Sequence, residues 1–591
     1  MPVSRRPRGH SCVRCNRRKI KCDGTQPCSA CRSASVICSA RPPAKSRQGR
    51  MKLQKLSTPT VSNSNEAATD EILLEDEGHP RYFNEPLWGH LSKELPIVPT
   101  PRDVTQATTS TCPATSILWG PCEYQSIQSF RPAPSLAFQL WQIFLDNVNP
   151  LSKMIHAPSA QNIITEATRD QSRVSRGSEA LMFSIYLCAV NSLKKSECET
   201  TLGESKNVLL QRYLTVTQQA LVNAEFLQSS SLIVLQSLTL YLVCMRQHFD
   251  HKSLWLLTGL AVRSAQRIGL HKANGSSLIS AFEAEMRHRL WWQILLVDSR
   301  AAQFAGLSLD IQMRDFFESR IPLNVNDCDI RPEMTSCPPD IETHSTEMLF
   351  CLVIYEAARF STSLQHAEAQ DMARIDEFRS SIQSKYLRFC DEAIPLHLLT
   401  KRLVQGLIAQ ISIKNFSNCK DNGTTNIPVT NRDAFFLWNI EVIECTNEIY
   451  STECLQRYLW FLHGLFPIES FVNILVELQH RHQGVMVDRG WDAISNIYNT
   501  FMDTDWVPCS NPNDLLYCAV GKLALKAWQA HAIYRHPTPL WVTRLREKER
   551  AANNDPLENL LFSNVHEEIE SGGAFEGAED IFQNLHINWA L

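Results

Sequence analysis

The sequence has no apolar run long enough to cross a membrane and no stretch typical of a secretion signal. Its most apolar windows, 181–190 and 231–245, contain polar residues and fall short of the roughly 20 residues that a spanning helix needs. Residues 1–8 are polar and basic rather than apolar. We therefore expect no export and no membrane partner. In a reducing compartment, cysteines scattered along a chain are usually small buried hydrophobes.

The sequence also lacks the common catalytic motifs. It contains no Gly-x-Ser-x-Gly elbow, phosphate-binding loop, His-Glu-x-x-His pair or dinucleotide-binding glycine pattern. His480 and His482 flank Arg481, but a pair without a third ligand is more typical of a solvated helix end than of a metal site. The sequence therefore predicts that the protein is not an enzyme.

Glycine is sparse, at 21 of 591 residues, and alternating β-branched runs are rare. From about residue 134, apolar residues recur at helical spacing, which predicts a large all-α domain over 134–550. Two such stripes should face its core: Leu254, Leu257, Ala261, Ala265 and Ile268, and then Leu290, Ile294, Val297, Ala301 and Phe304. On the second helix, we expect Glu283, Glu285, Arg287 and Arg289 to form ion pairs on the surface.

Charge is unevenly distributed along the chain. The total of 58 basic and 62 acidic residues gives a net charge of −4. Residues 1–56 nevertheless hold fifteen Lys or Arg and one acid, whereas 551–591 hold eight acids and no Lys or Arg. A strongly basic N-terminal arm favours a polyanionic partner such as nucleic acid, although charge alone also fits a solvated extension.

Six of the twenty cysteines cluster near the N-terminus in a duplicated pattern. Each half has two residues between its first two cysteines and six before its third, and five residues join the halves. The six are Cys12, Cys15, Cys22, Cys28, Cys31 and Cys38.

This duplicated spacing is typical of metal ligands, and a cysteine-rich loop without metal is the alternative. Six thiolates cannot fill two separate tetrahedral zinc sites, which need eight ligands. If one thiolate from each half bridges two zinc ions, both sites close with no open position. A closed site is structural, and its binding free energy would replace the apolar core that so short a segment lacks.

A basic run lies around the ligands of the first half. Its surplus of positive charge suits a phosphate backbone, or the guanine edge in the major groove of duplex DNA. The second half has only Arg32 between its ligands, so the halves should differ in role. The predicted DNA-binding residues are Arg14, Arg17, Arg18, Lys19 and Lys21.

At residues 12–38 the chain closely resembles the fungal six-cysteine binuclear zinc-cluster transcription factors. The spacing, the run 17–23 (RRKIKCD) and the proline before Cys28 are the family's. The resemblance implies two zinc ions, with Cys12 and Cys28 as bridging ligands. It also implies that Arg18 and Lys19 read a CGG triplet, and that the protein acts in the nucleus.

Part of the helical body resembles the regulatory middle domain of the same family. The likeness spans roughly 134–360 and rests on residues 141–151 (WQIFLDNVNPL), 265–271 (AQRIGLH), 282–292 (FEAEMRHRLWW) and 323–327 (LNVND). In the family, this region is thought to restrain activity or to sense an inducer. The resemblance therefore implies that 134–550 is a regulatory domain.

Residues 57–133, rich in Ser, Thr and Pro with an acidic patch at 71–77, are predicted to be a mostly disordered linker. The basic residues from Arg5 to Lys55 fit a nuclear import signal, DNA contact, or both. Family members often follow the cluster with a coiled coil, but only Leu53 and Leu56 precede Pro59 here. We expect either monomeric binding or a homodimer formed through the body.

The acidic tail, residues 551–591, alternates acids with large apolar groups. Such a segment can dock an apolar face on a coactivator, and a C-terminal helix packed on the body is the alternative. The predicted activation residues are Phe575, Ile581, Phe582, Leu585 and Trp589.

Together these features predict a nuclear, sequence-specific transcription regulator that acts as an activator of a pathway-specific gene set. The sequence of the middle domain resembles regulators of secondary metabolite gene clusters, which favours such a cluster as the target. A regulator of nutrient catabolism, either activator or repressor, is the near alternative. A zinc-dependent RNA-binding protein is the alternative from another class.

Overall fold

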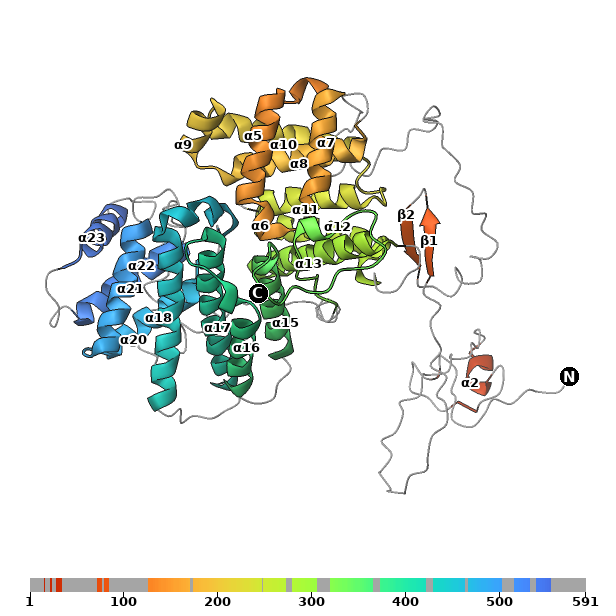
Figure 1. The fold of residues 1–591 in the computed structure, drawn as a ribbon. Helices are drawn as coiled ribbons and strands as arrows, with labels where there is room; N and C mark the ends of the chain where they lie inside the picture. The colour runs from red at the N-terminus through yellow and green to blue at the C-terminus, as the bar shows by residue number, and fades with distance from the viewer. Residues whose placement is uncertain are drawn as a thin grey trace. The chain divides into compact units, whose positions relative to one another are not determined.

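A computed structural model describes most of the chain (Figure 1). The described residues are 15, 22–23, 28–34, 72–76, 79–83, 126–170, 174–246, 248–272, 279–305, 319–364, 372–420, 429–462, 466–501, 515–531 and 538–553. The chain divides into two compact units, Met1–Ala68 and Thr69–Leu591. Each unit is therefore described by itself.

The second unit begins with a β-hairpin inside the predicted linker. Strand β1 (Ile72–Asp76) pairs antiparallel with β2 (His79–Phe83), with Ile72 opposite Phe83 and Asp76 opposite His79. The hairpin includes most of the acidic patch at 71–77, and the sequence interpretation did not foresee it.

The rest of the described body is helical, as predicted. Its amino-terminal half contains η1 Gln128–Phe130, α5 Pro134–Asn147, α6 Asn149–Ser152, α7 Ala157–Arg169, α8 Arg176–Ser192, α9 Lys195–Glu197, η3 Cys198–Leu202, α10 Lys206–Asn223, α11 Leu232–Met245, α12 His251–Arg267, η4 Leu270–Lys272, α13 Ala281–Phe304, η5 Asp327–Asp329 and α15 Leu349–Leu364. Its carboxy-terminal half contains α16 Met372–Lys385, η6 Leu387–Phe389, α17 Pro395–Lys420, α18 Val429–Ser451, η7 Glu453–Tyr458, α19 Leu459–Leu462, α20 Ile468–His480, α21 Val485–Phe501, α22 Leu515–His531 and α23 Leu540–Asn553.

Several helices begin at a residue whose side chain caps the first turn. Ser175, Asp250 and Ser280 each accept a hydrogen bond from the backbone N–H three residues later, at 2.9–3.1 Å. Such caps satisfy amide groups that have no partner within the helix. They fix the starts of α8, α12 and α13.

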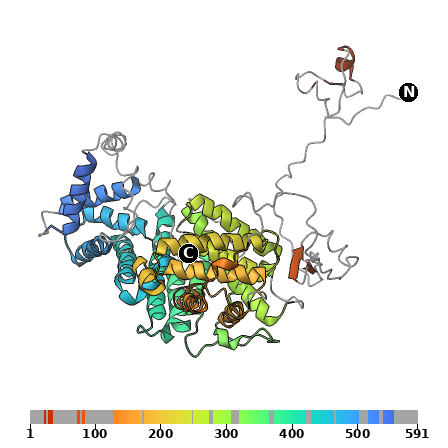
Figure 2. The same ribbon diagram turned by 90° about the horizontal axis from the view of Figure 1, so that it is seen from above.

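Two large apolar cores hold the body together. In the first, α8 and α11 are central helices, because every residue from Glu179 to Ser192 and from Val234 to Met245 is buried. The second joins α18 and α20–α23 around the buried indoles of Trp491, Trp528 and Trp541. The long helices α17 and α18 pack side by side (Figure 1) and link the two cores, because α17 contributes to the first and α18 to the second. Figure 2 shows the same fold from above.

The predicted core stripes are confirmed where the structure describes their side chains. Buried are Leu254, Ala261, Ala265, Ile268, Leu290, Ile294 and Ala301, while Leu257 and Val297 are partly buried against the same core. The side chain of Phe304 lies outside the described residues. His480 and His482 are exposed at the end of α20, as predicted. Within the described helices, none is both long and apolar enough to be a candidate membrane span.

The body also extends further toward the N-terminus than the predicted boundary at residue 134. Ile127 is buried in the first core, and Arg131 Nη2 donates to Glu179 Oε1 at 2.6 Å. Both side chains of that ion pair are about nine-tenths buried. Residues 126–133 are therefore part of the packed body rather than of the linker.

The prediction that the charged residues of 283–289 lie on the surface is wrong for most of them. Glu285, Arg287 and Arg289 are each at most 1% exposed. Helical spacing predicted the pairs themselves correctly, because Arg289 Nε donates to Glu285 Oε1 and Arg287 Nε to Glu283 Oε1. It could not show that the segment 319–330 would cover this face of α13.

That segment completes a buried ionic network. Arg289 Nη1 donates to Asp327 Oδ1 at 2.7 Å, and Lys153 Nζ donates to Asp327 Oδ2 at 2.9 Å. The backbone N–H of Leu323 donates to Glu285 Oε1 at 3.1 Å. Three of the stretches that resemble the family lie in or directly beside this cluster of charges. They are 141–151, 282–292 and 323–327.

Candidate metal centre

The metal centre is built around α2 (Ser29–Arg32), the short helix that follows Cys28. Cys28 has an extended backbone, and its carbonyl accepts hydrogen bonds from the N–H groups of Cys31 and Arg32. This turn brings the thiol groups of Cys28 and Cys31 close together. This is the local structure expected when two cysteines with two residues between them bind one metal ion.

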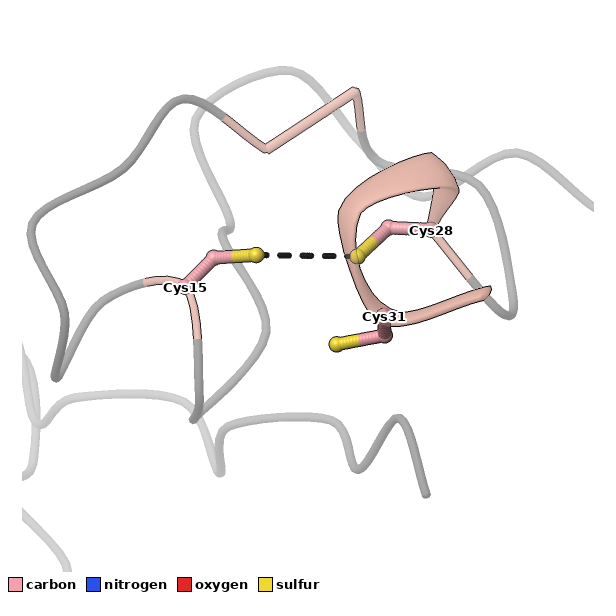
Figure 3. Close-up of side chains that lie close together, drawn as sticks. All are labelled: Cys15, Cys28 and Cys31. Atoms are coloured by element: carbon pink, nitrogen blue, oxygen red, sulfur yellow. Dashed lines mark hydrogen bonds between the residues drawn. The ribbon is translucent and has the colours of Figure 1, made fainter. Parts of the chain in front are cut away.

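Three thiol groups converge at this turn (Figure 3). The Sγ atoms of Cys15, Cys28 and Cys31 all lie within 4.8 Å of one another, and those of Cys15 and Cys28 are 3.6 Å apart. All three residues are fully buried. A disulfide would require about 2.05 Å between the sulfurs. Two sulfurs on one tetrahedral zinc ion, each about 2.3 Å from it, lie roughly 3.8 Å apart.

A second group of candidate ligands shares Cys28 with the first. Cys22, Asp23 and Cys28 also place one ligand atom each within 4.8 Å of one another. Cys28 is therefore the thiol that the two groups share. This is the arrangement that a sulfur bridging two metal ions needs. The donor set fits zinc, because buried thiolates with no open position form its structural sites.

Asp23 has a positioning contact that the sequence interpretation did not identify. Its Oδ2 accepts a hydrogen bond from the backbone N–H of Ser29 at 3.0 Å. The contact spans the five-residue loop between the two halves and satisfies an amide at the start of α2. The sequence feature that could have identified this contact is an acidic residue that directly follows the ligand Cys22 and comes a few residues before α2.

The structure brings together only part of the predicted site. Cys15, Cys22, Cys28 and Cys31 are described and lie close together, whereas Cys12 and Cys38 lie outside the described residues. Also outside them are the predicted DNA-binding residues Arg14, Arg17, Arg18, Lys19 and Lys21, and the predicted activation residues Phe575, Ile581, Phe582, Leu585 and Trp589. Arg32, the lone cation of the second half, is exposed on α2.

Two family models match the chain in the predicted order. Residues 10–47 match the fungal Zn(2)-Cys(6) binuclear cluster domain. Residues 141–348 match the fungal specific transcription factor domain. The second match begins in α5 and ends just before α15, so it includes the buried ionic network around Asp327.

Several named fungal proteins are similar to this chain over most of their length. The chain is 34% identical over 548 residues to the aurofusarin cluster transcription factor aurR2 of Gibberella zeae, covering 89% of this chain and 81% of that protein. It is 30% identical over 597 residues to the pyriculol/pyriculariol biosynthesis cluster transcription factor 1 of Pyricularia oryzae, covering 89% and 79%. The transcriptional regulator AacuB of Aspergillus aculeatus is 29% identical over 602 residues, with 88% and 81% covered.

A solved structure titled "Structure of the K. lactis CBF3 core" also matches, at a TM-score of 0.45 and 10% identity. The match covers 74% of this chain and 90% of that one.

Proposed function

Since the chain belongs to the fungal zinc-cluster transcription factors, we propose that it is a nuclear regulator that binds duplex DNA through its N-terminal unit and catalyses no reaction. Membership rests on the 34% identical relative and on the two family domains in their expected order. The cluster domain implies zinc binding.

The unit holds two zinc ions in a closed, purely structural site. Cys12 and Cys28 bridge the ions, and Cys15, Cys22, Cys31 and Cys38 are terminal ligands. The observation that carries this assignment is the position of Cys28, whose sulfur lies within reach of both ligand groups. Zinc supplies cross-links in place of an apolar core, and the chain's own residues supply the ligands and the capped turn that presents them.

The cations of the first half contact DNA. Arg14, Arg17 and Lys21 neutralise backbone phosphates, whereas Arg18 and Lys19 meet the O6 and N7 acceptors of guanine in a CGG element. The basic residues on either side of the cluster add affinity that depends on salt, and they direct import into the nucleus.

The target is a secondary metabolite biosynthetic gene cluster, which the protein activates. Two relatives carry cluster names, for aurofusarin and for pyriculol and pyriculariol. In this proposal the acidic tail docks on a coactivator, and any homodimer forms through the helical body. The tail is tested by deleting 571–591, because a reporter that stays fully active without it contradicts an activating role.

The decisive experiment combines zinc stoichiometry with DNA binding by the full chain. We expect two zinc ions per chain, and preference for duplex DNA with a CGG element over a scrambled duplex and over single-stranded RNA. Lys19→Gln should abolish that preference and leave the zinc content unchanged. Lys252→Gln, which removes an exposed lysine of the body, is the matched control. One zinc ion per chain would refute the binuclear site, and tighter binding to RNA would favour an RNA-binding protein.

A further inference from the structure

Helix α12 has an exposed outer face opposite the side that packs into the first core. Trp255 is 37% exposed and Leu256 is 66% exposed, and Arg263 is exposed two turns further along. Ala261 and Ala265, on the other side of the helix, are buried. Strand β2 also contacts α12, yet Trp255, Leu256 and Arg263 stay accessible beside it. The helix therefore presents apolar area and a cation to the surroundings of the chain.

Gly259 lies at the middle of this outer face. Among the described residues, no atom outside its own helix lies within 4 Å of the position that a Cβ on Gly259 would take. Gly490 differs, because a Cβ there would lie 3.2 Å from Phe436 Cζ, so α21 needs a glycine to pack on α18. A glycine inside a helix is less favourable than an alanine, and the described packing of the body does not require one at this position. The open space does leave room for the backbone of another helix to come close.

The residues on either side of Gly259 are placed symmetrically. Trp255 lies four residues before it and Arg263 four residues after it, so the three form one of the ridges along which helices pack. If two copies of this ridge cross antiparallel at Gly259, residues at equal distances from the crossing meet. Trp255 of each copy then faces Arg263 of the other, and a two-fold axis repeats that contact. Ridges of this kind run alongside each other at the commonest crossing angle, about −50°.

The contact that this symmetry creates is favourable. A guanidinium over an indole is a cation–π pair, which is strongest with tryptophan, and the absent side chain of Gly259 lets the two helices approach closely. Leu256, beside the ridge, adds exposed apolar area to bury. An unrelated partner would not need a tryptophan and a cation at equal distances from a glycine, whereas a second copy does. We propose that the outer face of α12 is a homodimer interface, in which two copies of this chain pack antiparallel across Gly259.

The inference rests on the proposed homodimer through the body and names the surface that forms it. Two joined chains bring two zinc-cluster units together, so binding of one unit to DNA raises the effective concentration of the other at a neighbouring element. The interface itself involves neither zinc nor a DNA contact. Zinc content and binding to a single CGG element should therefore be unchanged in the interface variants, and their absence in the wild-type chain would count against the proposed DNA binding alone.

Sedimentation of the full chain up to about 100 μM measures association, a range that includes weak interfaces with micromolar Kd values. We expect the wild type to dimerise and Gly259→Leu to weaken the dimer about tenfold or more, because the new side chain fills the space between the helices. Thermal unfolding of this variant should show an unchanged or raised Tm, since the position is open within the chain and leucine favours a helix. Leu540→Ala, which truncates a 63% exposed side chain on α23, should dimerise like the wild type.

An exchange of the two side chains tests the antiparallel pairing directly. Trp255→Arg alone places two guanidinium groups opposite each other at both contacts and should weaken the dimer about tenfold or more. Adding Arg263→Trp recreates the pair with its members exchanged and should restore most of the affinity, which a purely structural role of either residue cannot explain. The proposal is overturned if the wild-type chain is monomeric over the whole concentration range, if either Gly259→Leu or Trp255→Arg dimerises as the wild type does, or if the double variant stays as weak as Trp255→Arg.

Discussion

Arg289 Nη1 donates to Asp327 Oδ1 across 2.7 Å, joining α13 to the segment 38 residues further along the chain. Asp327 also accepts from Lys153 Nζ and from the backbone N–H of Ala157. One carboxylate thus connects three parts of the helical body. Its side chain is almost completely buried, so Lys153 and Arg289 would each lose a buried counter-charge without it.

Asp327→Asn should therefore destabilise the body severely. Removing one partner of a buried ion pair costs about 3–5 kcal/mol. Arg289 keeps Glu285 and Lys153 keeps Glu347, so we expect the lower end of that range. Urea unfolding of the full chain measures the loss in free energy of unfolding. The control is Glu392→Gln, which removes an exposed partner of Lys401 and should cost much less, because water screens that ion pair. Equal losses in the two variants would show that the network is not a main support of the fold.

Acidification should destabilise the body through His288. Burial, together with the smaller effect of the nearby Arg320 cation, lowers the pKa of His288 to about 4. The unfolded chain then binds a proton below about pH 6.5 that the folded chain does not bind until pH 4. The stabilisation present above pH 6.5 is thus lost as pH falls, by about 2 kcal/mol at pH 5.

Urea unfolding at pH 7 and at pH 5 tests this dependence. His288→Gln should flatten it by about that amount, whereas His480→Gln, at an exposed helix end, should leave it unchanged. An unaltered pH dependence in His288→Gln would contradict the prediction. A further loss is expected as pH falls from about 4 toward 2. Burial alone would raise the pKa of Asp327, but Lys153 and Arg289 outweigh it and hold that pKa to about 2.

The helices and the cysteine cluster could be predicted from sequence because both are local patterns. Apolar spacing identified the buried faces of α12 and α13, and cysteine spacing identified thiols that the structure brings together. The burial of Glu285 and Arg289 could not be predicted. It depends on the segment 319–330, which comes back over α13 from a distant point in the chain, and helical spacing alone cannot place such a segment.

Asp23 should stabilise the zinc centre by positioning rather than by ligation. Asp23→Ala removes the acceptor for the Ser29 N–H, and the loss of such a cap costs about 1 kcal/mol, which corresponds to a roughly fivefold weaker zinc affinity. Competition with a chromophoric chelator measures that affinity. Asp23→Asn keeps a side-chain oxygen and should bind zinc nearly as the wild type does. If Asp23→Asn loses as much affinity as Asp23→Ala or more, the carboxylate is a metal ligand instead.

Cys28→Ser should empty both zinc positions at once. Its sulfur lies within reach of both ligand groups, so each ion would lose a ligand. The core of this unit, in its described residues, consists of the cysteines themselves with Ala30, so the unit depends on the metal cross-links. Zinc content by elemental analysis should fall from two ions per chain to nearly none, and preference for CGG-containing duplex DNA should be lost with it. Cys454→Ser, which replaces an exposed free cysteine of the body, should retain both ions. A Cys28→Ser chain that keeps one full equivalent of zinc would show that Cys28 serves a single metal ion.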